Sequence, residues 1–493
     1  MKKIELIIPV LLIMIASTSC DTYLDVNTDP NNPTEVTPDL VLPVGQWYTA
    51  DLYQDDRGIN HLGNMMMFNW GEAYGFSWYD EEFNYLVTTT FYDDLFDRSY
   101  SSALKQYHIL TELDAEVYGS YKAIGMIMKA YHFQLLVDLY GDVPYSEALL
   151  RGENPTPAYD DASLIYDDLL VQLNDAISTI KTAEESATNV LPGEDDTMFG
   201  GDMTSWIQFA NTLKVRILTR LSDVRDAAFI QDELNIIATE GSGYITGDAG
   251  INPGYLVEEN KQNTYWDELG WDVSGTVQLT NDATCATQFI IDYLQNTNDP
   301  RISLMYEEPA DGHLGVDQGA DNNDPALGPD FVSNIGPGHL KSPTMTAVIF
   351  TEAELYFNLA ELAFKGFGGD PKEYYYDGVL ASMDYLAPDA TNNVQKRDSY
   401  LNQSFQNVSY DASSNKLEAI LTQKWLATNG ITAEQSWFDY SRTGLPSFIP
   451  VSEDASTDDR PVRLAYPASE ITANNENVPD QPNVFTNKIF WAN

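Results

Sequence analysis

The chain has 493 residues, with 75 Asp and Glu against 26 Lys and Arg, so its formal net charge is −49. This balance excludes a nucleic-acid-binding protein, because a surface that neutralises phosphates must be basic. It is not a disordered acidic polymer either, since 43% of the residues are hydrophobic and 12% are aromatic, enough for a packed core.

The beginning of the chain has the anatomy of a bacterial secretion signal. Lys2 and Lys3 precede an apolar run of about a dozen residues, and small residues then lead to Cys20. Because roughly 20 apolar residues are needed to cross a bilayer, the run is not a membrane span. A cysteine in this place resembles a lipobox, so we predict a signal peptide over residues 1–19 and lipidation of Cys20. The alternative is an ordinary cleavage site with a cysteine nearby. Residues 20–40, rich in Pro and Asn, are interpreted as a lipidated N-terminal tether.

Helical periodicity dominates the chain from about residue 100 onward, in segments separated by short turns. Residues 121–140 are apolar almost all round, which predicts a central helix that ends at Gly141. Small residues such as Ala353 and Ala360 suit close helix pairs, similar to those of tetratricopeptide repeats, although no strict repeat recurs. The predicted helices cover residues 101–118, 121–140, 161–180, 204–224, 227–239, 286–296, 345–364, 372–385, 416–429 and 433–440.

Two long segments, residues 40–92 and 241–341, show little periodicity and are rich in aromatic residues. Long irregular segments of this kind often carry function. Flat Trp and Tyr faces stack on sugar rings or ligand side chains, and the polar residues between them fix orientation. The alternative is that the rings fill a core beneath the loops. We expect both clusters to lie on one face of the scaffold. The candidate ligand-binding residues are Trp70, Tyr74, Trp78, Tyr79, Tyr265, Trp266 and Trp271.

Catalytic and metal-binding motifs are absent from the sequence. It contains no GxSxG, HExxH, CxxC, Walker A or GxGxxG pattern, and its five histidines never stand at helical metal-ligand spacing. Adjacent acids such as Glu81 and Glu82 offer the carboxylates of a glycoside hydrolase, but some such pairs are expected among 75 acids. Residues 311–330 hold enough aspartates to bind Ca²⁺ but lack the EF-hand spacing. The two interpretations of this segment are a calcium site and a plain acidic surface loop.

Several segments resemble the SusD/RagB family of nutrient-binding outer-membrane lipoproteins, in its SusD-like branch. They follow the family's order along nearly the whole mature chain. The segments are LDVNTDPNNPTEVTPDLVLP (24–43), LLVDLYGDVPYSEAL (135–149), DPR (299–301), EAELYFNLAELAFKG (352–366), QKWLATNGITAEQSWFDYSRTGLP (423–446) and RPVRLAYPASE (460–470).

This resemblance implies a mainly α fold, in which tetratricopeptide-like helix pairs form a scaffold and long irregular loops carry the ligand face. It implies one domain over residues 41–493, with loop-rich insertions near residues 60–92 and 241–341. The expected protein is anchored by lipid in the outer membrane, facing outside. It binds oligosaccharides or peptides and delivers them to a SusC-like TonB-dependent transporter.

The resemblance also implies that the protein is not an enzyme and has no catalytic residues. A secreted all-helical glycoside hydrolase with an Asp/Glu pair is the alternative. Because the binding loops vary within the family, no family motif covers the aromatic candidates, which are inferred from local composition. No cofactor is expected apart from a calcium ion, which is one of the two interpretations of residues 311–330.

Overall fold

The structure is a computed structural model that describes residues 37–320 and 323–492. The predicted signal peptide, Cys20 and most of the predicted tether lie outside the described residues. Within the described ranges, no helix combines the length and the apolar character that a bilayer crossing needs.

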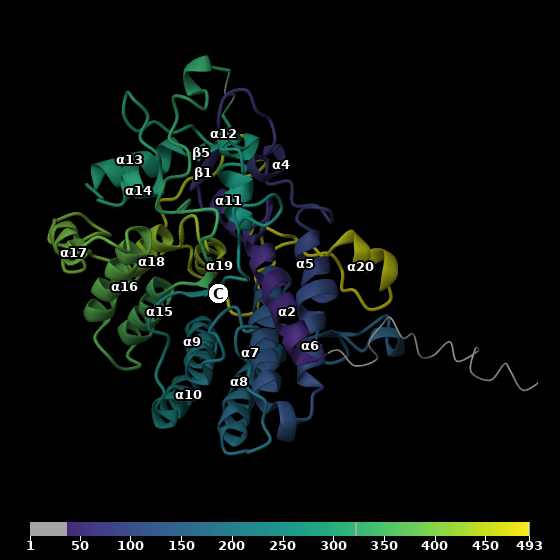
Figure 1. Cartoon of the computed structure of the whole chain (residues 1–493). Helices are drawn as coiled ribbons and strands as arrows, with labels where there is room; N and C mark the ends of the chain where they lie inside the picture. The colour runs from purple at the N-terminus through teal and green to yellow at the C-terminus, as the bar shows by residue number, and fades with distance from the viewer. Residues whose placement is uncertain (1–36, 321–322, 493) are drawn as a thin grey trace, which may run out of the picture.

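Helices packed side by side form one end of the molecule (Figure 1). They are α6 (Lys105–Thr111), α7 (Ala115–Tyr140), α8 (Ala162–Glu184), α9 (Met203–Leu221) and α10 (Ala227–Glu240). From Gly119 onward α7 is buried over most of its circumference, and it ends at Gly141, whose φ is 79°. The central position and the end of this helix agree with the prediction from the sequence.

A second group of helices lies beside the first (Figure 1). It comprises α15 (Glu352–Phe364), α16 (Pro371–Leu386), α17 (Asn393–Leu401), α18 (Lys416–Thr428) and α19 (Glu434–Thr443). The helix α15 packs against α16 and α18 within this group and against α9 of the first group. The mainly α class built from helix pairs is therefore confirmed.

A buried ion pair joins the two helix groups. Arg216 of α9 donates from Nε to Oε1 of Glu354 at 2.7 Å and from Nη2 to Oε2 at 2.8 Å. The guanidinium also lies over the ring of Phe350, 4.0 Å from its centroid. Such a bidentate geometry fixes both the distance and the rotation of the two helices.

Short strands replace the first residues of two predicted helices. Residues 345–364 and 286–296 were predicted as continuous helices, but β6 (Ala347–Phe350) and β5 (Thr284–Ala286) precede α15 and α13 (Gln288–Asn296). The strand β6 pairs with β4 (Ala249–Ile251). In both cases a threonine begins the helix after the strand, because the hydroxyl of Thr351 or Thr287 accepts a backbone N–H of the first turn.

Two helices occupy the first half of the segment predicted to be irregular at residues 40–92, which corrects that part of the prediction, and the first of them begins within the predicted tether. They are α2 (Pro38–Gln54) and α3 (Ile59–Met66). The pattern of α2 was obscured because it buries a polar residue and a glycine among its apolar ones. Gln46 donates to Asp196 Oδ1 at 2.7 Å, and the missing side chain of Gly45 leaves room for the ring of Tyr107.

The remaining elements are short. Residues 101–118, which the periodicity predicts as one helix, are divided between the π-helix η1 (Ser99–Leu104), α6 and the start of α7. The short elements are β1 (Trp70–Glu72), α4 (Asp80–Phe83), α5 (Asp94–Arg98), η1 (Ser99–Leu104), β2 (Val143–Pro144), η2 (Arg151–Glu153), β3 (Tyr159–Asp160), α11 (Thr264–Leu269), α12 (Leu279–Ala283), α14 (Ile302–Met305), η3 (Pro325–Leu327) and α20 (Ala468–Ala473).

Candidate functional site

The two aromatic segments lie together at the end of the molecule away from α8 and α10. Figure 1 shows β1 and α4 of the first segment beside β5, α11 and α12 of the second. The strands β1 and β5 are antiparallel neighbours, with Trp70 opposite Ala286. The hydroxyl groups of Tyr79 and Thr284 form a hydrogen bond of 2.7 Å between the same segments. The structure therefore brings together segments that lie about 200 residues apart.

Three of the seven candidate aromatic residues are buried in the core. The exposed fractions are 0% for Trp70, 2% for Tyr79 and 4% for Tyr265. The ring of His61 packs edge-on against both Trp70 and Tyr79, with centroid separations of 5.5 and 5.0 Å. These three residues fill the core beneath the loops and offer no open face to a ligand, so they drop out of the predicted stacking surface.

The other four candidates have solvent-exposed area. Tyr74 and Trp78 are 36% and 39% exposed, while Trp266 and Trp271 are half-buried. The rings of Trp266 and Trp271 lie 4.9 Å apart at 44°. Over the described part of the chain, no ring contact joins Trp78 to this pair. The exposed aromatic residues therefore form two separate platforms, one with Tyr74 and Trp78 and the other with Trp266 and Trp271.

The turn between α2 and α3 contacts both aromatic segments. Gln54 Oε1, at the end of α2, accepts a hydrogen bond from Asn263 Nδ2 at 2.7 Å, at the residue that caps α11. On the other side of the turn, Arg57 Nη2 donates to the backbone carbonyl of Trp78 at 3.2 Å. This turn is thus the physical link between the two platforms.

A small cavity of about 10 Å³ lies at this turn. Trp70 of the first aromatic segment and Tyr265 of the second both line it, together with His61, Asp56 and Glu268. The last three were not singled out from the sequence. Asp55 and Asp56 form one of many adjacent acidic pairs, and nothing local distinguishes them from the rest.

The cavity is strongly acidic. Burial, together with the negative charges of Asp55 and Asp56, raises the pKa of Glu268 to about 7. Burial also raises the pKa of Asp56 above its usual range. Burial lowers the pKa of His61 to about 3, so its imidazole is neutral at physiological pH.

The cation next to the cavity, Arg98, already forms ion pairs with other acids. Arg98 binds Asp55 Oδ2 through Nη1 at 2.6 Å and also pairs with Asp51. Among the described residues, no Lys or Arg forms an ion pair with Asp56 or Glu268. Asp56 and Glu268 therefore line this cavity without a Lys or Arg ion-pair partner among the described residues, although the positive charge of Arg57 acts on Asp56.

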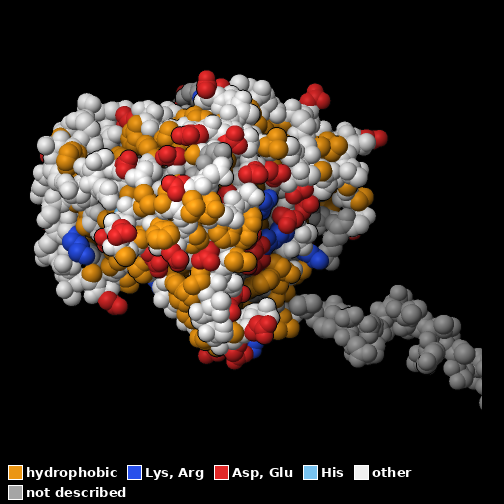
Figure 2. All heavy atoms as spheres, turned by 90° about the horizontal axis from the view of Figure 1, so that it is seen from above, with side chains coloured by type: hydrophobic (Ala, Val, Ile, Leu, Met, Phe, Trp, Pro, Cys, Tyr) orange, Lys and Arg blue, Asp and Glu red, His pale blue; other side chains and the backbone are white. Residues whose placement is uncertain are grey.

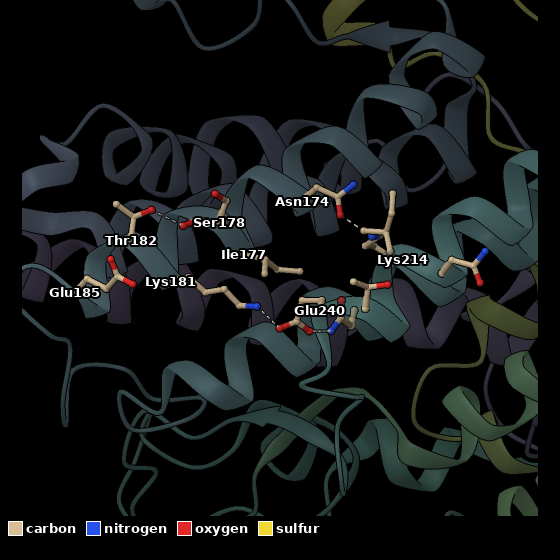
Figure 3. Close-up of a pocket in the computed structure, with 12 residues that line it drawn as sticks. Asn174, Ile177, Ser178, Lys181, Thr182, Glu185, Lys214 and Glu240 are labelled. Atoms are coloured by element: carbon tan, nitrogen blue, oxygen red, sulfur yellow. Dashed lines mark hydrogen bonds and ion pairs between the residues drawn. The ribbon is translucent and has the colours of Figure 1, made fainter.

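A larger cleft of about 700 Å³ lies far from the aromatic platforms, between α8, α9 and α10 (Figure 3). Its cationic groups are used within the protein, because Lys181 pairs with Glu240 at 2.8 Å and Lys214 donates to Asn174 Oδ1 at 2.6 Å. No aromatic residue lines it. A cleft of this composition has no flat face on which a sugar ring could stack.

Metal binding has no support in the described part of the chain, which holds no group of three or more His, Cys, Asp or Glu side chains suited to a metal ion. Asp321, in the acidic loop considered as a calcium site, lies outside the described residues.

The surface seen from above, which looks onto the loop-bearing end, shows carboxylates and hydrophobic side chains interspersed with few Lys or Arg (Figure 2).

Comparison with known proteins gives one family and many similar folds. Residues 30–467 match a SusD-like family model described as "starch-binding associating with outer membrane". A chitin-binding SusD homolog from Flavobacterium johnsoniae has a TM-score of 0.74 at 19% identity, covering 91% of this chain and 98% of its own.

Two further structures are similar. A SusD homolog from Bacteroides fragilis has a TM-score of 0.71 at 20% identity and covers 93% of this chain and 99% of its own. A chitin-binding protein has a TM-score of 0.70 at 23% identity, covering 92% and 99%. At these identities the likeness shows a shared fold. No curated protein matches the sequence.

Proposed function

This chain belongs to the SusD-like family, and from that premise we propose that it binds nutrient oligosaccharides at the loop-bearing end of its helical scaffold. The observation that carries the proposal is the pair of exposed aromatic platforms at that end. Trp78 on one platform is 39% exposed, and Trp266 and Trp271 on the other are half-buried, with their rings 4.9 Å apart. Stacking on such faces, oriented by polar neighbours, is how proteins hold sugar rings.

Replacing Trp78 or Trp266 by alanine is expected to weaken oligosaccharide binding, with little loss of stability for the exposed Trp78 and a larger loss for Trp266, which packs against the core. Each ring contributes on the order of 0.5–1.5 kcal/mol to stacking, so the dissociation constant should rise about 2- to 13-fold. The measurement is titration calorimetry with starch and chitin oligosaccharides, beside a thermal unfolding curve for each variant.

Trp70→Ala serves as the contrasting variant, because Trp70 is fully buried. It should lose about 3–5 kcal/mol of unfolding free energy. If Trp78→Ala lowered the melting temperature as strongly as Trp70→Ala and left the affinity of the folded fraction unchanged, Trp78 would be a core residue and the stacking proposal would fail.

We also propose that the protein is a surface lipoprotein that passes its ligand to a TonB-dependent transporter in the same membrane. The family description supports association with the outer membrane. A tether that holds the binding site beside a transporter raises the local ligand concentration, so modest affinity per site is sufficient.

The anchor is tested at Cys20. Cys20→Ala should move the protein from the membrane fraction to the soluble fraction and abolish incorporation of labelled palmitate, while a Ser19→Ala variant keeps both. Equal labelling of the wild-type protein and Cys20→Ala would show that the lipid is attached elsewhere or not at all.

A glycoside hydrolase is the second candidate, favoured by the raised pKa values of Glu72 and Glu268, both about 7 and both due first to burial. A general acid needs a raised pKa, although its partner carboxylate should have a different pKa, and these two values are equal. However, the cavity beside Glu268 is about 10 Å³, which does not admit a sugar ring. New reducing ends released from starch or chitin, and lost in Glu268→Gln, would favour the hydrolase.

A further inference from the structure

We propose that a cavity between α6, α7 and α8 is a second binding site, and that it takes the carboxylate of an acidic sugar such as a uronic acid. The cavity lies among the first group of helices, away from the end that carries the aromatic platforms (Figure 1). The inference goes beyond the proposed function, because neither platform contributes a residue to this site.

The floor of the cavity is the uncovered stripe of α7. Helices α6 and α8 both pack against α7. Over residues 119–140 of α7, the residues that are not buried are Lys122, Met126 and Lys129, which stand at i, i+4 and i+7 on one face of the helix. All three line the cavity. A core helix therefore places two ammonium groups on its open side.

The cavity has room for a sugar residue. Its volume is about 410 Å³, within the range of roughly 300–1,000 Å³ that is typical of small-molecule sites. Met126, Ala130 and Phe133 supply apolar lining, and polar side chains from α6, α8 and the segment after α7 complete it. Sites of this kind hold a ligand by apolar contact and orient it through a few polar or charged groups.

The two lysines are not neutralised by carboxylates of the protein. Lys129 forms no ion pair or hydrogen bond with another described residue, and Lys122 donates to the backbone carbonyl of Leu113 at 3.2 Å. Burial lowers the pKa of Lys129, and the charge of Glu112 offsets this effect in part.

Other lysines of the helical scaffold do have such partners. Lys214, Lys365 and Lys424 each pair with a carboxylate at 2.6–3.3 Å. A chain with 75 acids thus leaves the half-buried Lys129 without one. An anion bound in the cavity would supply the missing partner through charge-assisted hydrogen bonds, which are stronger than neutral ones.

A carboxylate that also lines the cavity selects hydroxyl groups on the ligand. Asp168 of α8 pairs with neither lysine among the described contacts, and its Oδ2 accepts from the hydroxyl of Tyr145 at 2.5 Å and from Gln172 Nε2 at 3.3 Å. Its Oδ1 accepts from no described residue and is left for a donor on the ligand. A uronic acid carries a carboxylate for the lysines and hydroxyl groups for Asp168 on one ring. A glutamate side chain has no hydroxyl, which favours the acidic sugar over an acidic peptide.

The test compares the affinities of D-glucuronate and D-glucose by NMR titration, at about 0.15 M salt. The two sugars differ at one carbon, which is a carboxylate in glucuronate and a hydroxymethyl group in glucose. We expect glucuronate to bind the wild-type protein about tenfold more tightly than glucose, as one charge-assisted hydrogen bond implies.

Lys129→Gln should remove this preference and leave the affinity for glucose unchanged. Lys105→Gln is the matched control, because it removes the same charge from an exposed position on α6 outside the cavity lining. Lys122→Gln is a second variant at the cavity, and thermal unfolding verifies that each variant is folded. A preference that survives in both Lys122→Gln and Lys129→Gln, or that Lys105→Gln removes equally well, would not come from the cavity and would overturn the proposal.

Other outcomes separate this site from the aromatic platforms. Trp78→Ala should leave glucuronate binding unchanged, and Lys129→Gln should leave the binding of starch and chitin oligosaccharides unchanged. Loss of glucuronate binding in Trp78→Ala would place the acidic sugar on a platform and overturn the second site. Equal binding of glucuronate and glucose, or binding of neither, overturns the site as well and leaves the proposed function to its own test. Binding of triglutamate that depends on Lys129, without binding of glucuronate, assigns the cavity to an acidic peptide and overturns the acidic sugar.

Discussion

Replacing Gly63 by alanine is expected to destabilise the protein by about 3 kcal/mol or more, the upper range for inserting a methyl group into a packed interior. Gly63 lies in α3, where that helix crosses the start of α19. A Cβ at this position would lie 2.0 Å from the backbone N of Glu434 and 2.4 Å from the carbonyl carbon of Ala433. Backbone atoms cannot rotate away, so the two helices must separate.

The matched control is Gly152→Ala, because a Cβ there meets no atom within 4 Å and the residue has no positive φ. Its unfolding free energy should stay within about 0.5 kcal/mol of the wild-type value. Urea denaturation followed by circular dichroism measures both variants. Equal midpoints for Gly63→Ala and the wild type would mean that α3 and α19 are not in direct contact in solution.

Gly63→Ala also bears on the candidate site. Asn64 Oδ1 accepts the backbone N–H of Gly430 at 2.9 Å, so α3 is held against the segment before α19, and the same helix carries His61 to the cavity. A shift of α3 should therefore reduce oligosaccharide binding in whatever fraction of the variant still folds. The close approach at Gly63 positions the floor of the site.

The second large effect is expected at Arg216, where replacement by methionine should cost about 3–5 kcal/mol of unfolding free energy. Although burial alone would lower the pKa of Arg216, the charge of Glu354 raises it above its usual value. Both side chains are at most 3% exposed. Removal of the guanidinium leaves the Glu354 carboxylate buried without its main partner, which is the source of the penalty.

The double variant Arg216→Met/Glu354→Leu tests this explanation. Replacing both partners by apolar groups should recover most of the loss, because no uncompensated charge remains. The single variant should be less destabilised at about pH 5 than at about pH 8, since proton uptake by the orphaned carboxyl relieves the penalty at the lower pH. A double variant no more stable than Arg216→Met would show that packing against Phe350, and not charge, holds α9 to α15.

The sequence by itself determined the helices whose periodicity reflects one dominant buried side. The end of α7 at Gly141 follows from local chemistry, since a glycine there takes the positive φ that stops the helix. Four of the segments that resemble the SusD-like family, residues 135–149, 299–301, 352–366 and 423–446, lie in these helices or next to them, so the fold class and the family also followed from the sequence. A helix that packs against its neighbours on one side shows a regular spacing of apolar residues in the sequence.

The α2 helix and the division of the aromatic residues depended on contacts distant in the chain. Gln46 is buried only because Asp196 and Thr197 reach it from the segment before α9. Trp70 and Trp78 stand eight residues apart in one aromatic run, yet one is buried beneath His61 while the other is 39% exposed. No periodic pattern separates them, because their exposure depends on α3 and β5.

The candidate cavity was decided by tertiary structure alone. Asp56, His61, Trp70 and Glu268 come from three separate segments, and each is unremarkable among its neighbours in a chain with 75 acids. Their chemical meaning arises from convergence, since burial beside other carboxylates is what raises the pKa of Glu268 to about 7. Local sequence records the helix a residue belongs to, whereas the environment of a titratable group is set by every segment that packs around it.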